Sequence, residues 1–159
     1  MPSVLFICTA NRFRSPLAAA WFQKRLQGEV DARDWSVGSA GTWAEAGQTV
    51  VPPAKWMAEH FGVDLDAHRS QRVGGDLLSR YNLVLVMENN QREGLLVEFP
   101  QFEGRILLLS QAATGVAYDI PDPGVIPDES FLDIAREVTG LVDKGFQNIC
   151  RLARQSASS

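Results

Sequence analysis

A cysteine and an arginine stand near the start of the chain, Cys8 and Arg14, with five residues between them. A cysteine thiolate is a strong nucleophile, and the planar guanidinium of arginine can donate to two oxygens of one phosphate. This pair is therefore suited to attack on a bound phosphoryl group. The spacing alone is weak evidence, because arginine is common and a lone intracellular cysteine is more often a buried structural residue.

The residues on both sides of the pair strengthen the chemical interpretation. Four consecutive apolar residues, Val4 to Ile7, are typical of a strand covered on both faces of a parallel sheet. Ser15 is predicted to be a helix N-cap, and Pro16 to be the first helical residue. The loop between this strand and helix would present its backbone amides to a tetrahedral oxyanion. We therefore expect Cys8 to be stabilised as a thiolate by these amides and by Arg14.

The rest of the sequence alternates between apolar strand patterns and helical patterns. Strands are predicted at 35–40, 81–87 and 105–109; helices are predicted from Ser15 to near Gly28, from Pro53 to Gly62, and at 76–80, 89–97 and 130–153. Residues 43–53 are predicted to be a long loop. The alternation predicts an α/β fold, doubly wound and flavodoxin-like, with a four-stranded parallel sheet and helices on both faces. Its ligand would lie at the carboxyl ends of the strands.

Length and composition limit the classes of protein to which the chain can belong. With 159 residues it is predicted to form one domain, residues 1–159, in which 155–159 are a frayed tail. The net charge of −4 argues against a nucleic-acid partner, and no apolar run is long enough to span a membrane. Two distant cysteines and the absence of a signal-peptide pattern predict a cytoplasmic protein with reduced thiols. His60 and His68 lack the neighbours of a metal site, so no metal or cofactor is expected.

Over nearly its whole length the sequence resembles the low-molecular-weight protein tyrosine phosphatases. Four motifs occur in the order of that family: the phosphate loop 8–15, Ser-Ala-Gly-Thr at 39–42, His-Arg-Ser at 68–70, and Ile-Pro-Asp-Pro at 120–123. The resemblance implies hydrolysis of a phosphorylated protein, most simply at phosphotyrosine, through a cysteinyl-phosphate intermediate, with inorganic phosphate as the product.

The resemblance also assigns roles to individual residues. Cys8 would be the nucleophile, Arg14 would hold the phosphate, and Asp122 would be the general acid, with Asp119 as the second choice. The other phosphate-loop residues would bind the phosphate or shape the loop: Thr9, Ala10, Asn11, Arg12, Phe13 and Ser15. Ser15 would also donate to the thiolate, and Ser39 and His68 would support Asn11.

Several positions depart from the family pattern. Ala10 and Phe13 stand where the family usually has a glycine and a second cysteine, so Ala10 requires a negative φ and Cys8 loses a disulfide partner. Arg12 adds a cation that would attract an acidic substrate, or point to solvent, and it argues against phosphoarginine as substrate. Gly124 replaces an aromatic wall of the substrate slot. Trp43 would either supply a wall from the other side or be an ordinary core or surface tryptophan.

Two other functions fit part of the pattern. Thiol-coupled arsenate reductases share the fold and the loop but need a close pair of resolving cysteines, and here only Cys150 follows the loop. A catalytically weak phosphate-binding module would explain the departures at Ala10, Arg12, Phe13 and Gly124. It would not require a nucleophile, an arginine and an acid together.

Overall fold

The computed structural model describes residues 1–123 and 128–158, and its helices and strands alternate along the chain. In chain order these are β1 (Ser3–Cys8), α1 (Arg14–Leu26), η1 (Ala32–Asp34), β2 (Ser36–Gly41), α2 (Pro52–Phe61), α3 (Gly75–Ser79), β3 (Leu83–Val86), α4 (Asn89–Glu98), η2 (Pro100–Arg105), β4 (Ile106–Leu108), α5 (Leu109–Thr114) and α6 (Asp128–Ser158).

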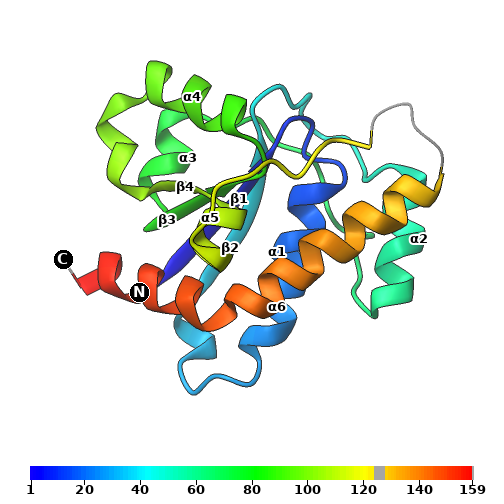
Figure 1. The fold of residues 1–159 in the computed structure, drawn as a ribbon, viewed down its shortest axis with the longest axis horizontal. Coiled ribbons are helices and arrows are strands. Elements are labelled where there is room, and N and C mark those ends of the chain that lie inside the picture. Colours follow the sequence, from blue (N-terminus) through cyan, green and yellow to red (C-terminus); the bar gives the residue numbers. More distant parts are fainter. Residues whose placement is uncertain (124–127, 159) are drawn as a thin grey trace.

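The four strands form one parallel sheet in the order β2-β1-β3-β4. Helices cover both faces of the sheet: α1 and α6 lie on one side, and α3 and α4 lie on the other (Figure 1). The predicted doubly wound α/β fold is therefore confirmed. The strand order reverses at β1, with β2 on one side and β3 on the other, and ligands of such sheets bind at the carboxyl ends beside this point.

The strand β1 lies at the centre of the sheet, and both of its faces are covered by helices, which explains its uninterrupted apolar run. Val4 and Phe6 pack with α1 and α6, whereas Leu5 and Ile7 pack with α3 and α4. All four side chains are fully buried. Cys8 ends the strand on the face of α1, which places its thiol at the carboxyl edge of the sheet.

Several predicted boundaries are corrected by the structure. β3 and β4 are shorter than predicted, at Leu83–Val86 and Ile106–Leu108. α6 continues beyond Ala153 to Ser158, so the predicted frayed tail is helical up to that residue. The predicted stop of α2 at Gly62 is confirmed, since this glycine has a left-handed φ of 75°.

The start of α1 also differs from the prediction. Phe13, not Ser15, is the N-cap, and the helix begins at Arg14. The Ser15 hydroxyl contacts Cys8 and Asn11 instead of a helix amide. Pro16 still lies in the first turn, where a missing amide hydrogen leaves no hydrogen bond broken. Within the described residues, no helix combines the length and the apolar character that crossing a membrane requires.

Candidate active site

The loop that follows β1 turns its carbonyl groups outward. Hydrogen bonds from outside the loop reach the carbonyl oxygens of Cys8, Thr9, Asn11, Arg12 and Phe13. The donors are, in the same order, the amides of Thr42 and Trp43, the Nε2 of His68, and the amides of Val51 and Leu17. In a trans peptide the amide hydrogen points away from the carbonyl oxygen. The amides that follow these carbonyls therefore face the inside of the loop, where they form a nest for an anion.

Asn11 fixes the shape of this loop. It has a φ of 58° and is fully buried. Its side-chain amide donates to Ser15 Oγ at 2.8 Å and to Ser39 Oγ at 3.0 Å, and its Oδ1 accepts from the Gln71 amide. Asparagine tolerates the left-handed region better than most residues with a side chain. Ala10 does not share this conformation, so its methyl group is accommodated without strain.

The Cys8 thiol lies against the Ser15 hydroxyl. Their Sγ and Oγ atoms are 2.9 Å apart, and both residues are buried. Ser15 Oγ accepts from Asn11, so its own hydrogen remains to be donated. This arrangement allows Ser15 to donate a hydrogen bond to sulfur.

Arg14 is held by contacts on one edge of its guanidinium. Nη1 donates to Glu88 Oε2 at 3.0 Å and to the Ile120 carbonyl at 2.7 Å. Nη2 lies 3.8 Å from Asp122 Oδ2, and only 3% of the arginine side chain is exposed. The guanidinium is therefore fixed between the end of β3 and the segment that carries Asp122.

These residues surround a cavity of about 170 Å³, which we call the Cys8 cavity. It is lined by Cys8, Ala10, Arg12, Phe13, Arg14, Val51, Asp122, Pro123 and Phe131. The structure thus brings together the predicted nucleophile, the predicted phosphate-binding arginine and the predicted acid. Cys8 and Asp122 are more than a hundred residues apart in the sequence, and the fold brings them to the same cavity.

The two candidate acids occupy different places. Asp122 lines the Cys8 cavity, with 55% of its side chain exposed. Asp119 accepts a hydrogen bond from the Asn89 amide at 2.8 Å, which places it at the N-terminus of α4. A carboxylate at that end of a helix has an ordinary structural role. The geometry therefore favours Asp122 over Asp119 as the general acid.

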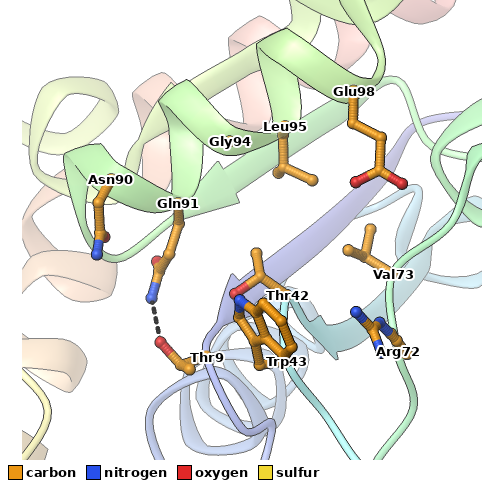
Figure 2. Close-up of a pocket in the computed structure, with 10 residues that line it drawn as sticks. All are labelled: Thr9, Thr42, Trp43, Arg72, Val73, Asn90, Gln91, Gly94, Leu95 and Glu98. Atoms are coloured by element: carbon orange, nitrogen blue, oxygen red, sulfur yellow. Dashed lines mark hydrogen bonds between the residues drawn. The ribbon is translucent and has the colours of Figure 1, made fainter.

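Trp43, which was predicted to supply an aromatic wall of the substrate slot, does not line the Cys8 cavity. Its amide donates to the Thr9 carbonyl, so the residue lies on the outer side of the loop, and its ring faces Arg72 and α4 (Figure 2). The Thr9 side chain is also on this outer side, where its Oγ1 accepts from Gln91. Gly124, whose substitution was predicted to remove a wall, lies outside the described residues.

Phe13 and Phe131 provide the aromatic surface of the Cys8 cavity instead. Their ring centroids are 5.1 Å apart. Phe131 lies in the first turns of α6, and Val51 precedes α2. No local motif marks Phe131 or Val51, because only the packing of α6 and α2 around the loop brings them to the cavity.

Arg12 stands at the edge of the same cavity. Its Nε donates to the Thr49 carbonyl at 2.7 Å, and the side chain is partly buried. The guanidinium is thus neither deep in the phosphate nest nor free in solvent. It adds positive charge at the entrance.

Glu88 is a functional residue that the sequence interpretation missed. It is the residue before α4, directly beyond the end of β3, and its carboxylate accepts from both Arg14 and Gln91. A polar residue at the carboxyl edge of a parallel sheet was a usable signal. Its partner Arg14 is 74 positions away, so the pairing itself was not readable.

His68 supports the loop from behind. Its Nε2 lies 2.8 Å from the Asn11 carbonyl, which can only accept, so Nε2 carries the hydrogen. Burial lowers the pKa of His68 below its ordinary value, the bond to Asn11 opposes this shift, and Arg69 lowers the pKa further. Ser39 reaches the same asparagine through its side chain.

Comparison with known proteins gives the family of the chain. The family described as "Low molecular weight phosphotyrosine protein phosphatase" matches residues 3–155. The protein named "Probable low molecular weight protein-tyrosine-phosphatase EpsP" of Ralstonia nicotianae is 34% identical over 121 residues, which are 76% of this chain and 77% of that protein. The chain therefore belongs to the low-molecular-weight phosphotyrosine protein phosphatase family. It is an enzyme of the cysteine-dependent phosphatase class.

Solved structures agree with this membership. The low molecular weight protein tyrosine phosphatase from T. tengcongensis superposes with a TM-score of 0.83 at 29% identity, over 92% of this chain and 99% of that one. The YwlE arginine phosphatase from Geobacillus stearothermophilus superposes with a TM-score of 0.82 at 28% identity, over 99% of this chain and 94% of that one. Proteins named for two different substrates, phosphoarginine and phosphotyrosine, thus share this fold.

Proposed function

We propose that this protein hydrolyses phosphotyrosine in proteins through a covalent cysteinyl-phosphate. The observation that carries the proposal is the Cys8 cavity, in which Cys8, Arg14 and Asp122 meet. The whole chain would act as one phosphatase domain without a cofactor. Because the nucleophile must stay a reduced thiol, we place the enzyme in the cytoplasm.

In the first step, the Cys8 thiolate attacks phosphorus and a sulfur–phosphorus bond forms. The bond between phosphorus and the tyrosine oxygen breaks, and Asp122 gives its proton to the departing oxygen. The loop amides and the outer edge of the Arg14 guanidinium hold the equatorial oxygens, where charge develops. Ser15 donates to sulfur before the attack.

In the second step, a water molecule attacks the cysteinyl-phosphate. Asp122, now a carboxylate, takes a proton from this water as the new phosphorus–oxygen bond forms. The sulfur–phosphorus bond breaks, and Cys8 leaves as a thiolate that again accepts the Ser15 hydrogen bond. Inorganic phosphate is released.

The walls of the Cys8 cavity favour an aromatic phosphoester. An aromatic ring of the substrate would meet an apolar surface above the phosphate nest, made by Phe13, Phe131, Val51 and Pro123. A guanidinium substrate would instead meet the cation of Arg12 at the entrance. For this reason we prefer phosphotyrosine to phosphoarginine, although one similar structure is titled an arginine phosphatase.

Cys150 argues against arsenate reduction. It is fully buried in α6, and burial raises the pKa of its thiol to about 11. A resolving cysteine must reach the first cysteine and react as a thiolate. A buried, protonated thiol meets neither need.

Hydrolysis of para-nitrophenyl phosphate tests the proposal. Wild type, Cys8→Ser and Asp122→Ala are compared between pH 4.5 and 8, with Cys150→Ser as a control for a cysteine outside the site. We expect no turnover with Cys8→Ser, slow turnover with Asp122→Ala and wild-type rates with Cys150→Ser. A fully reduced wild type without activity would favour a phosphate-binding module, and thiol-dependent consumption of arsenate would favour a reductase.

A further inference from the structure

A second cavity, of about 240 Å³, lies across the phosphate loop from the Cys8 cavity, and we call it the α4 pocket (Figure 2). It is lined by Thr9, Thr42, Trp43, Arg72, Val73, Asn90, Gln91, Gly94, Leu95 and Glu98. Thr9 of this pocket and Ala10 of the Cys8 cavity are consecutive residues, whose Cα atoms are about 3.8 Å apart. The two cavities therefore lie on either side of the same short stretch of the loop.

Gly94 makes room in this pocket. It lies inside α4, where glycine is a poorer helix former than alanine. A β-carbon at this position would meet no atom within 4 Å, and Gly94 is not among the glycines with positive φ. Neither packing nor backbone conformation requires glycine here. Its effect is to leave the space between α4 and Trp43 open.

Trp43 offers an exposed aromatic face at this space. Its side chain is 75% exposed, and the Arg72 guanidinium carbon lies 5.1 Å from its ring centroid. The backbone of Trp43 is fixed by the bond from its amide to the Thr9 carbonyl at 2.9 Å. The indole therefore extends from a fixed backbone position and leaves surface open for stacking with another ring.

The α4 pocket contains one positive and one negative side chain. Arg72 contributes a positive charge and Glu98 a negative one, and both line the same space (Figure 2). The remaining surface is the indole, the apolar side chains of Leu95 and Val73, and uncharged polar groups. Such a lining gives no advantage to an acidic or a basic ligand, and it favours an uncharged ring.

We propose that the α4 pocket is a specificity subsite that binds an aromatic side chain of the protein substrate, close in sequence to the phosphorylated residue. This inference rests on the proposed phosphotyrosine phosphatase function. Ring stacking on Trp43 binds ground state and transition state alike, because the pocket lies outside the Cys8 cavity. Occupation therefore lowers KM and leaves kcat unchanged.

Gln91 explains why the occupant should not disturb catalysis. Its Nε2 donates to Thr9 Oγ1 and Glu88 Oε2, and its Oε1 accepts from the amides of Met87 and Glu88. The amide group has no further hydrogen to offer a ligand. This wall of the pocket is thus fixed before a ring enters.

Phosphotyrosine peptides test the subsite. One alanine-rich peptide is compared with versions in which a phenylalanine occupies successive positions on either side of the phosphotyrosine. At one position we expect phenylalanine to lower KM by about three- to tenfold at equal kcat. Gly94→Phe fills the pocket and should reduce this preference to about onefold, whereas Gly94→Ala should keep it.

Gly140→Phe is the matched control, since Gly140 is an exposed glycine inside α6 that also has open space around it. It should retain the full preference for the phenylalanine peptide. If no position shows a preference, or if Gly94→Phe retains it, the subsite is wrong while the phosphatase function stands. Failure to hydrolyse any phosphotyrosine peptide, with para-nitrophenyl phosphate still hydrolysed, would overturn the proposed substrate and the subsite with it.

Discussion

The two cavities beside the phosphate loop differ in how deeply their principal side chains are buried. Around the Cys8 cavity, Asn11, Arg14 and Ser15 are buried, and each makes hydrogen bonds to fixed partners. In the α4 pocket, Trp43 is mostly exposed, and the Arg72 guanidinium lies over the face of the Trp43 ring. One side of a single loop is therefore rigid and desolvated, and the other side presents an open aromatic surface.

This difference follows from the tasks of the two sides. Stabilising charge in a transition state requires donors that do not reorganise, and burial strengthens their effect. Recognising a neighbouring side chain needs only surface and shape. Changes around the Cys8 cavity should therefore alter kcat strongly, and changes in the α4 pocket should alter KM for selected peptides.

The largest effect should come from Arg14→Lys. Lysine keeps the charge but loses the planar fork that Glu88 and Ile120 hold in place, so kcat should fall by about a thousandfold. Steady-state hydrolysis of para-nitrophenyl phosphate measures this loss. Arg151→Lys, on the exposed face of α6, is the control and should stay near wild type. A loss of less than tenfold for Arg14→Lys would contradict the rigid-site account.

Asp122→Asn should have the next largest effect, because asparagine cannot give or take the required proton. We expect kcat to fall by about a hundredfold for phenyl phosphate and by less for para-nitrophenyl phosphate, whose leaving group needs less protonation. Asp119→Asn, at the start of α4, should lower both rates little. Equal losses for the two substrates would speak against Asp122 as the general acid.

Glu88→Gln should show how much the position of the Arg14 guanidinium depends on its ion pair with Glu88. The neutral amide weakens the bond to Arg14 Nη1, and we expect kcat to fall by about tenfold through misplacement of the guanidinium. Glu93→Gln is the matched control, because Glu93 is an exposed residue of α4, the helix that Glu88 precedes. A wild-type kcat for Glu88→Gln would mean that the contacts of Arg14 with the Ile120 carbonyl and Asp122 are sufficient to position it.

His68 should give the smallest effect, and in stability instead of rate. Its folded pKa is below the unfolded value of about 6.5, so the unfolded chain binds more protons and stability is lost as the pH falls through the folded pKa. Thermal unfolding between pH 8 and 5 measures this loss. In His68→Gln the decline over that range should be smaller, and an equal decline in both proteins would exclude His68 as its source.

The sequence was sufficient for the fold and for the main residues of the Cys8 cavity. The buried run of β1 and the alternation of patterns predicted the sheet, and two of the four motifs contain the predicted nucleophile, arginine and acid. Each of these signals lies within a few neighbouring residues. Local pattern was misleading at Ser15, where a good capping residue instead contacts the Cys8 sulfur.

What the sequence could not supply is contact between distant segments. Trp43 lines the α4 pocket and not the Cys8 cavity, because its place is set by the bond between its amide and the Thr9 carbonyl. Glu88 reaches Arg14, and Phe131 reaches the Cys8 cavity, only through the packing of β3 and α6. Such placements follow from tertiary structure, which no short spacing encodes.

Rapid quenching of the reaction in acid, followed by mass spectrometry of the peptide that contains Cys8, tests the central claim most directly. With phosphotyrosine peptide as substrate, we predict that Cys8 carries one phosphoryl group during turnover and that the group disappears when substrate is exhausted. The Asp122→Ala variant should form it more slowly. Turnover without phosphorylated Cys8, together with activity in Cys8→Ser, would contradict the account.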